Sequence, residues 1–172
     1  GHWFRSRSRY GPLVHAALLP AQENSGKLVT QVKQEARRLA ESDGYAALLV
    51  DGPPGIGCPV IAAASGATLA LIVAEPTAAG IHDMARAAEL AAHFRIPALL
   101  CINKADIYAA GAAQIEAFAL DNGIRIAGRI PFDSRITDAM VQGEPVTAYA
   151  PEAPASAALR ELWASVARRL ME

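Results

Sequence analysis

The feature that most constrains the fold is a repeated alternation of solid apolar runs with segments of helical periodicity. The apolar runs are residues 45–51, 68–75, 96–104 and 124–133. Helices are expected over residues 25–44, 58–67, 77–95, 109–123, 134–143 and 151–172. Unbroken apolar runs are typical of strands that are buried on both faces, and their alternation with helices predicts a parallel sheet. We therefore expect an α/β fold with a mostly parallel sheet flanked by helices on both faces.

Length and composition favour a single domain over residues 1–172, in which residues 1–20 form a strand or hairpin that leads in. The net charge of −1 gives no indication of nucleic-acid binding. Glycine, proline or charge interrupts the apolar runs before they could cross a bilayer, so we expect no stable membrane insertion. The two cysteines and the polar first residues indicate a cytoplasmic protein.

Functional residues are expected where the strands end, because ligands of open α/β sheets bind beyond the carboxyl ends of the strands. The residues at these ends are Asp51–Gly55, Glu75–Thr77, Asn103–Asp106 and Pro131–Asp133. All four segments contain polar or loop-forming residues. We expect them to line one edge of the sheet.

The first of these segments reads Asp-Gly-Pro-Pro-Gly. A carboxylate at a strand tip can serve Mg²⁺, which prefers oxygen ligands and keeps several waters. Gly52 and Gly55 allow the backbone to come close to a phosphate. The alternative is a tight strand-to-helix turn in which Asp51 caps the helix.

The segment Ile-Asn-Lys-Ala-Asp matches the base-recognition motif of GTPases. In that motif the aspartate accepts two hydrogen bonds from guanine, the asparagine contacts the base and the lysine stem stacks along it. The alternative is a polar helix entry capped by Asp106. The segment Glu-Asn-Ser-Gly-Lys-Leu-Val at residues 23–29 is not a Walker A loop, because its Gly-Lys is followed by leucine and no glycine stands five residues before Gly26.

Several long segments together resemble the MinD superfamily of P-loop ATPases. The matching segments are residues 23–77, GIHDMARAAELAAHF at 80–94, CINKAD at 101–106 and RIPFDSRITDAMVQGEPV at 129–146. The resemblance is to the branch that carries an inserted ferredoxin domain, often labelled the cobyrinic acid a,c-diamide synthase nucleotide-binding family. It covers nearly the whole chain.

The resemblance implies roles for individual residues. Asp51 would be the catalytic switch residue and would bind Mg²⁺ through water, and Gly55 would meet the terminal phosphate of ATP. Asn103 would contact the base, which in this superfamily is usually adenine despite Asp106. The nucleotide-binding residues implied are Gly52, Pro53, Gly55, Asn103, Lys104, Asp106, Pro131 and Phe132.

Residues 1–172 depart from the family pattern in two ways. The first strand with its Walker A loop and the cysteine-rich ferredoxin insert, where the 4Fe–4S clusters would lie, are both absent. The chain therefore resembles the C-terminal part of a longer ATPase linked to iron–sulfur or redox chemistry, and alone it is expected to be inactive. A GTPase-like domain and a nucleotide-free interaction module are the alternatives.

The absent strand has a structural consequence. The resemblance places it between the strands expected at 45–51 and 68–75. Strands that lack a neighbour have unpaired backbone groups and an apolar edge. We expect these two strands either to pair directly or to pair with a second copy in a homodimer, and the protein partner is otherwise unknown.

Overall fold

The structure is a computed structural model that describes residues 2–18 and 26–172. The chain divides into two compact units, residues 1–67 and residues 68–172. We describe each unit by itself. The expectation of a single domain over residues 1–172 stays a prediction.

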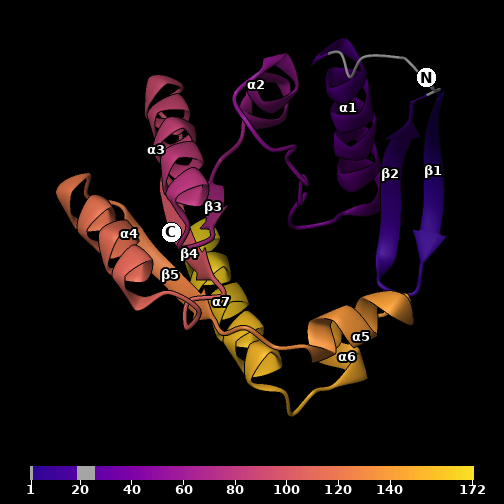
Figure 1. Cartoon of the computed structure of the whole chain (residues 1–172). Coiled ribbons are helices and arrows are strands. Elements are labelled where there is room, and N and C mark those ends of the chain that lie inside the picture. The colour runs from indigo at the N-terminus through magenta and orange to yellow at the C-terminus, as the bar shows by residue number, and fades with distance from the viewer. Residues whose placement is uncertain (1, 19–25) are drawn as a thin grey trace. The chain divides into compact units, whose positions relative to one another are not determined.

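The first unit begins with an antiparallel hairpin, as expected within residues 1–20 (Figure 1). Its strands are β1 (His2–Ser8) and β2 (Gly11–Ala17), and Gly11 has a φ of +133° at the turn. Such a φ is accessible to glycine and strained for other residues. The hydroxyl of Ser8 donates to the carbonyl of Gly11 at 2.9 Å and closes the turn.

Helix α1 (Gly26–Asp43) confirms the helix expected from the spacing of its apolar residues. Ser25, which precedes the helix and is of a residue type that can cap one, lies outside the described residues. On α1 the buried carboxylate of Glu35 forms ion pairs with Arg5 of the hairpin and with Arg38, the latter at 2.7 Å. This pairing attaches the hairpin to the helix. The alternation of Arg5 and Arg7 along the strand would by itself favour a solvated face.

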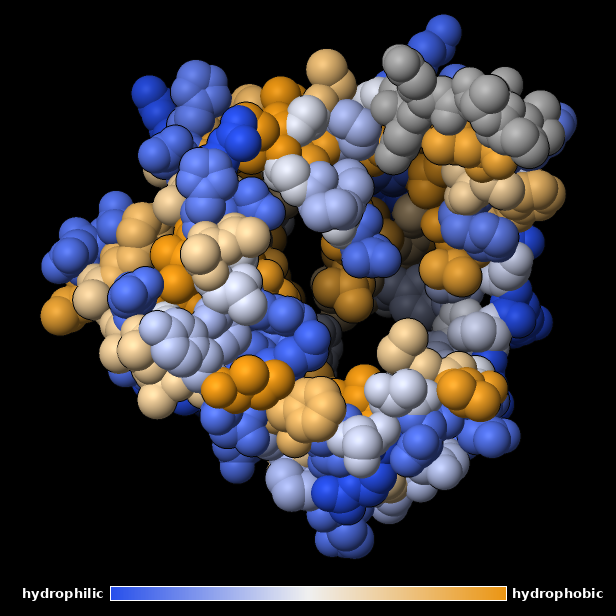
Figure 2. All heavy atoms as spheres, viewed as in Figure 1, coloured by the Kyte–Doolittle hydropathy of each residue, from blue (hydrophilic) through white to orange (hydrophobic). Residues whose placement is uncertain are grey.

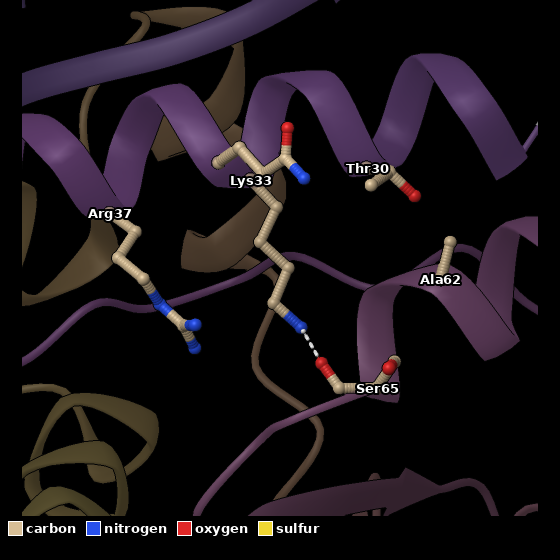
Figure 3. Close-up of a pocket in the computed structure, with 6 residues that line it drawn as sticks. Thr30, Lys33, Arg37, Ala62 and Ser65 are labelled. Atoms are coloured by element: carbon tan, nitrogen blue, oxygen red, sulfur yellow. Dashed lines mark hydrogen bonds between the residues drawn. The ribbon is translucent and has the colours of Figure 1, made fainter.

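Helix α2 (Cys58–Ala64) is short and is held by α1. The Lys33 ammonium donates to the carbonyl oxygens of Ala63 at 2.5 Å and of Ser65 at 2.6 Å. Figure 3 shows the Lys33 side chain reaching from α1 toward Ser65, with Arg37 beside it. The last carbonyls of a helix have no partner within the helix, so a lysine at this position acts as a C-terminal cap. Burial and the Arg37 charge lower the pKa of Lys33.

The prediction of a strand at residues 45–51 is wrong. The segment has no ladder partner, and its side chains are exposed, Leu49 by 85%. Its composition suits a buried strand, but a strand needs a neighbour to receive its N–H and C=O groups. Within the described residues no strand adjoins it.

The second unit confirms the parallel sheet. Its strands are β3 (Ala70–Ala74), β4 (Ala98–Asn103) and β5 (Arg125–Ile130), in the order β3–β4–β5. Its helices are α3 (Ala78–His93), α4 (Ala109–Asp121), α5 (Arg135–Val141), α6 (Val146–Tyr149) and α7 (Pro154–Met171). Only α6 was not expected.

Helices cover both faces of this sheet (Figure 1). Leu100 and Ile102 of β4 face a cluster built with residues of α3 and α4. The alternate residues Leu99 and Cys101 face a cluster built with α7. Since successive side chains of a strand point to opposite faces, this double burial explains why the β4 sequence has no polar alternation.

Strand β3 forms one edge of the sheet, because β4 is its only strand neighbour among the described residues. Residues 45–51 belong to the other compact unit, so their expected pairing with β3 stays a prediction. Val73 of β3 is 55% exposed. Figure 2 shows that apolar residues reach the surface elsewhere as well. Leu170 of α7 is also exposed, by 39%, although it continues the helical spacing of the buried Leu162 and Val166.

Candidate functional site

Three loops follow the strands of the second unit and define its carboxyl edge. They begin at Glu75 after β3, at Lys104 after β4 and at Pro131 after β5. The three strands are parallel and adjacent, so all three loops leave the sheet at the same edge. The structure therefore brings together the part of the expected site that lies in residues 68–172.

The loops after β3 and β4 are joined by an ion pair. The Lys104 ammonium lies 2.7 Å from a carboxylate oxygen of Glu75, and both side chains are about two-fifths exposed. Lys104 has a φ of +52°, in the left-handed region that non-glycine residues occupy at some cost. Strained backbone of this kind often occurs at functional sites. Lys104, whose stem the sequence motif places along the nucleotide base, thus has its ammonium paired with the loop after β3.

The loops after β4 and β5 are joined at two points. The backbone N–H of Phe132 donates to Oδ1 of Asp106 at 2.7 Å. The backbone N–H of Ala105 donates to the carbonyl of Ile130 at 3.0 Å. Asn103, half-buried at the end of β4, is in register with Ile130. These contacts fix the Asn-Lys-x-Asp segment against the Pro-Phe segment.

Asp133 anchors the far side of the β5 loop. It is 9% exposed, and both of its carboxylate oxygens accept hydrogen bonds from the Arg135 guanidinium, at 2.8 and 2.9 Å. These side-chain hydrogen bonds, with backbone N–H donors of Arg135 and Ala155, hold the pKa of Asp133 below its usual value. Ala155 lies in the first turn of α7, whose own preceding residue, Ala153, offers no side-chain cap. Asp133 therefore supplies a negative charge to that helix end.

The remaining expected residues, Asp51, Gly52, Pro53 and Gly55, lie in the first unit. Asp51 is exposed, in a segment that is not a strand, so it does not stand at a strand tip as the sequence suggested. Gly55 has a φ of +90°. The expected loop with an accessible carboxylate and a glycine turn is present. We assign it no geometry relative to the second unit.

A magnesium ion bound with a nucleotide needs only one or two protein carboxylates, since phosphates and water supply the other oxygens. The exposed Asp51 carboxylate suits that role by its chemistry. Among the described residues, no group of three histidine, cysteine or acidic side chains could hold a metal by itself. A Mg²⁺ site at Asp51 would therefore depend on the nucleotide.

The two cysteines do not suit an iron–sulfur cluster, which thiolates normally hold in sets of four. Cys101 is fully buried in β4, and burial raises the pKa of its thiol to about 11. Because Cys101 is fully buried it is closed to a cluster from outside, and its raised pKa disfavours the thiolate that a cluster requires. Cys58 at the start of α2 is exposed, and it is a single thiol.

Sequence reasoning placed the three strand-end loops at one edge but missed the residues that join them. Glu75 was identified only by its position after a strand, and Asp133 only as the end of a loop. The spacing of Asp133 and Arg135, two residues apart at a helix entry, was the available signal for their ion pair. The Glu75–Lys104 pair has no local signal, because its members lie on different strands.

A parallel sheet covered by helices, with an Asn-Lys-x-Asp loop at its carboxyl edge and an Asp-x-Pro-x-Gly loop elsewhere in the chain, places this protein in the class of P-loop NTPases. More specifically, residues 26–167 match the ParA family, described as NUBPL iron-transfer P-loop NTPase. The chain belongs to this family. The resemblance to MinD/ParA-like ATPases is confirmed.

Two relatives match the chain over part of their own length. The iron-sulfur cluster carrier protein of Pyrococcus horikoshii is 26% identical over 161 residues, which cover 86% of this chain and 54% of the relative. The uncharacterized protein MJ0578 of Methanocaldococcus jannaschii is 33% identical over 93 residues, covering 54% of this chain and 32% of the relative. The chain thus spans between about a third and about half of these relatives.

The fold also agrees with solved structures. The MinD cell division protein of Aquifex aeolicus superposes with a TM-score of 0.70 at 25% identity, covering 97% of this chain and 68% of that one. In the part of the chain that the structure describes, no helix is long and apolar enough to cross a membrane.

Proposed function

We propose that this chain is the C-terminal part of an ATP-binding and ATP-hydrolysing protein that serves iron–sulfur or redox chemistry. The observation that carries the proposal is the carboxyl edge of the second unit, whose loops are joined to one another. The Asp106–Phe132 hydrogen bond joins the loops after β4 and β5, and the Lys104–Glu75 ion pair joins the loops after β3 and β4. An edge held in this way is prepared to receive a flat base. The family match supports the ATPase assignment, and the similarity to iron-sulfur cluster carriers supports the link to clusters.

Each expected site residue keeps its role within this proposal. Asp51 holds Mg²⁺ through water and acts as the catalytic switch residue, and the magnesium ion neutralises phosphate charge when it is bound. The residues that contact the phosphates are Gly52, Pro53 and Gly55. The residues that surround the base are Asn103, Lys104, Asp106, Pro131 and Phe132.

The loop that grips the phosphates lies, in this proposal, outside residues 1–172. These residues contain no Gly-x-x-x-x-Gly-Lys-Ser/Thr sequence. Residues 1–172 alone are therefore expected to bind nucleotide weakly and to hydrolyse it at no useful rate. We also propose that the protein belongs to the branch with an inserted ferredoxin domain, labelled the cobyrinic acid a,c-diamide synthase family.

Iron–sulfur clusters would be carried by residues outside this chain. The buried, protonated Cys101 leaves Cys58 as the one exposed thiol of residues 1–172. One thiol cannot complete a four-thiolate site. We therefore place the 4Fe–4S ligands in the ferredoxin insert of the longer protein.

A homodimer in the cytoplasm is the assembly that we propose. The open edge of β3 offers backbone hydrogen-bonding groups and the exposed Val73 to a second copy. An apolar edge strand of this kind tends to pair with another chain. The proposal also includes a protein partner of unknown identity and no nucleic-acid partner.

A GTPase is the second candidate, and the literal Asn103-Lys104-x-Asp106 sequence is the observation that favours it. In that case GTP would bind more tightly than ATP and would displace it in competition binding. A nucleotide-free interaction module is the third reading, in which neither nucleotide binds. Competition binding to the intact protein separates the three.

The test is the thermal stability and turnover of the intact protein with ATP or GTP, with and without Mg²⁺. A ligand that binds only the folded state raises stability according to its concentration over Kd. We expect ATP with Mg²⁺ to stabilise most, and Asp51→Asn to weaken the Mg²⁺-dependent part by about 10- to 100-fold in affinity. Because Asp51 is exposed, the variant should fold normally.

Asp83→Asn, at an exposed position of α3, is the matched control and should behave as the unmodified protein. Unchanged Mg²⁺-dependent ATP turnover in Asp51→Asn would refute the assignment of Asp51. A clear preference for GTP that is lost in Asp106→Ala would favour the GTPase candidate instead.

A further inference from the structure

Asp106 is bonded within the protein itself. Its Oδ1 accepts the backbone N–H of Phe132 at 2.7 Å, a short and charge-assisted hydrogen bond. One residue earlier, Ala105 donates to Ile130. Two hydrogen bonds therefore join the loops after β4 and β5, and Asp106 accepts one of them.

Phe132 has a fixed backbone and an exposed ring. On one side its N–H is held by Asp106, and on the other side the next residue, Asp133, is buried and bound by Arg135. Its side chain is nevertheless 57% exposed. A large apolar ring held in this way contributes little to a core. It suits a flat apolar ligand that stacks on it, since stacking on an aromatic ring does not depend on which base is present.

Reading a guanine requires more from Asp106. A carboxylate that reads guanine accepts hydrogen bonds from two donors of the base, one to each oxygen. Here the Phe132 N–H takes one of the two acceptor sites of Oδ1, so the protein itself orients the Asp106 carboxylate, and Lys104 is paired with Glu75. Both charged side chains of the Asn-Lys-x-Asp segment are thus occupied by contacts between loops.

We infer that Asp106 is a positioning residue, which holds the Phe132 ring as a stacking platform for the base and does not read guanine. The inference rests on the proposed function and names the means by which the site accepts its base. In this inference the site selects its base by stacking and by the shape of the carboxyl edge of the sheet, without hydrogen bonds from Asp106 to the base. The hydrogen bond of Asp106 to Phe132 is then required whichever base is bound.

Three substitutions in the intact protein test this. Asp106→Asn keeps an oxygen that can accept from Phe132, whereas Asp106→Ala removes it. Phe132→Ala removes the ring. The matched control is Asp121→Ala, at an exposed position at the end of α4. The first readout is the affinity for ATP, GTP and xanthosine triphosphate (XTP). The second readout is hydrogen exchange of the Phe132 amide in the absence of nucleotide.

We expect Asp106→Ala to weaken ATP binding roughly 3- to 10-fold, the value of one lost hydrogen bond. Phe132→Ala should weaken it roughly 5- to 100-fold through lost stacking. Asp106→Asn should lose less than Asp106→Ala. Exchange at the Phe132 amide should accelerate in Asp106→Ala and much less in Asp106→Asn, because the amide is protected by this hydrogen bond.

XTP decides between positioning and base reading. Xanthine carries an oxygen where guanine carries an amino group, so an asparagine that contacts the base would favour XTP. A gain of XTP binding in Asp106→Asn, or unchanged exchange at Phe132 in Asp106→Ala, would overturn the inference and leave nucleotide binding intact. Binding of none of the three nucleotides to the unmodified protein would overturn the proposed function together with the inference.

Discussion

Gly111 in α4 lies so close to the carbonyl oxygen of Pro76 that a Cβ on this glycine would be 2.4 Å from it. Pro76 follows Glu75 in the loop after β3, and it is buried. The contact is between backbone atoms of two elements, which cannot yield as a flexible side chain can. The glycine therefore permits the helix to approach the loop that carries one member of the Glu75–Lys104 pair.

Gly111→Ala should destabilise the protein by about 1–3 kcal/mol, the usual cost of overpacking. This loss opposes the higher helix propensity of alanine, which alone would stabilise the helix by about 1 kcal/mol. Urea unfolding measures the difference. Gln114→Ala, on the exposed side of the same helix, should change stability by less than about 0.5 kcal/mol. A Gly111→Ala protein as stable as the unmodified one would contradict the close approach.

The Asp133–Arg135 pair predicts an acid-sensitive part of stability. Because the folded state holds the pKa of Asp133 below its value in the unfolded chain, the stabilisation is present above the unfolded pKa of about 3.9. It is lost as the pH falls below that value toward the folded pKa. Asp133→Asn should therefore differ most from the unmodified protein near neutral pH and least at low pH.

A double-mutant cycle with Arg135→Gln supplies the control for this prediction. The coupling free energy between the two residues, from urea unfolding, should be favourable at pH 7 and should shrink below pH 4. A coupling that is independent of pH between 7 and 2 would show that the Asp133 charge is not what Arg135 stabilises.

The Lys33 cap predicts a local effect on α2. Lys33→Met keeps the apolar stem and removes the hydrogen bonds to Ala63 and Ser65. Since the ammonium is partly exposed, we expect a loss of about 1–2 kcal/mol. Lys27→Met, at an exposed position of the same helix, is the control and should be nearly neutral. Equal unfolding free energies for the two variants would argue against the cap.

The open edge of β3 predicts self-association of residues 1–172. Sedimentation should show a concentration-dependent dimer, and Val73→Lys should shift it toward monomer, because a charge on an edge strand opposes pairing. Leu120→Lys, on an exposed position of α4, should leave the dimer in place. A monomer at every concentration would count against the proposed assembly.

Two apolar runs show how far the sequence could predict the fold. Residues 98–103 form the central strand β4, because β3 and β5 lie on either side and helices cover both faces. Residues 45–51 have the same character and form no strand. Composition reports that a segment suits a buried ladder, but the ladder requires a neighbouring strand, which composition does not report.

The candidate site shows the same limit at the level of single residues. The order of strands and loops was enough to predict that Asn103 and Pro131 meet at one edge. It was not enough to predict that Asp106 would turn toward the Phe132 amide. That orientation depends on the register between two strands and on the backbone conformation at Lys104, and neither has a signature in the local sequence.

The unequal burial of the two thiols makes the natural sequence suitable for site-specific labelling. A thiol whose pKa is raised to about 11 by burial, as in Cys101, reacts slowly with maleimides, since the thiolate is the nucleophile. A fluorophore or spin label would therefore attach at the exposed Cys58. That residue begins α2, three positions after Gly55. Spectroscopy on residues 1–172 can thus report on the motion of the Asp51–Gly55 loop without an introduced cysteine.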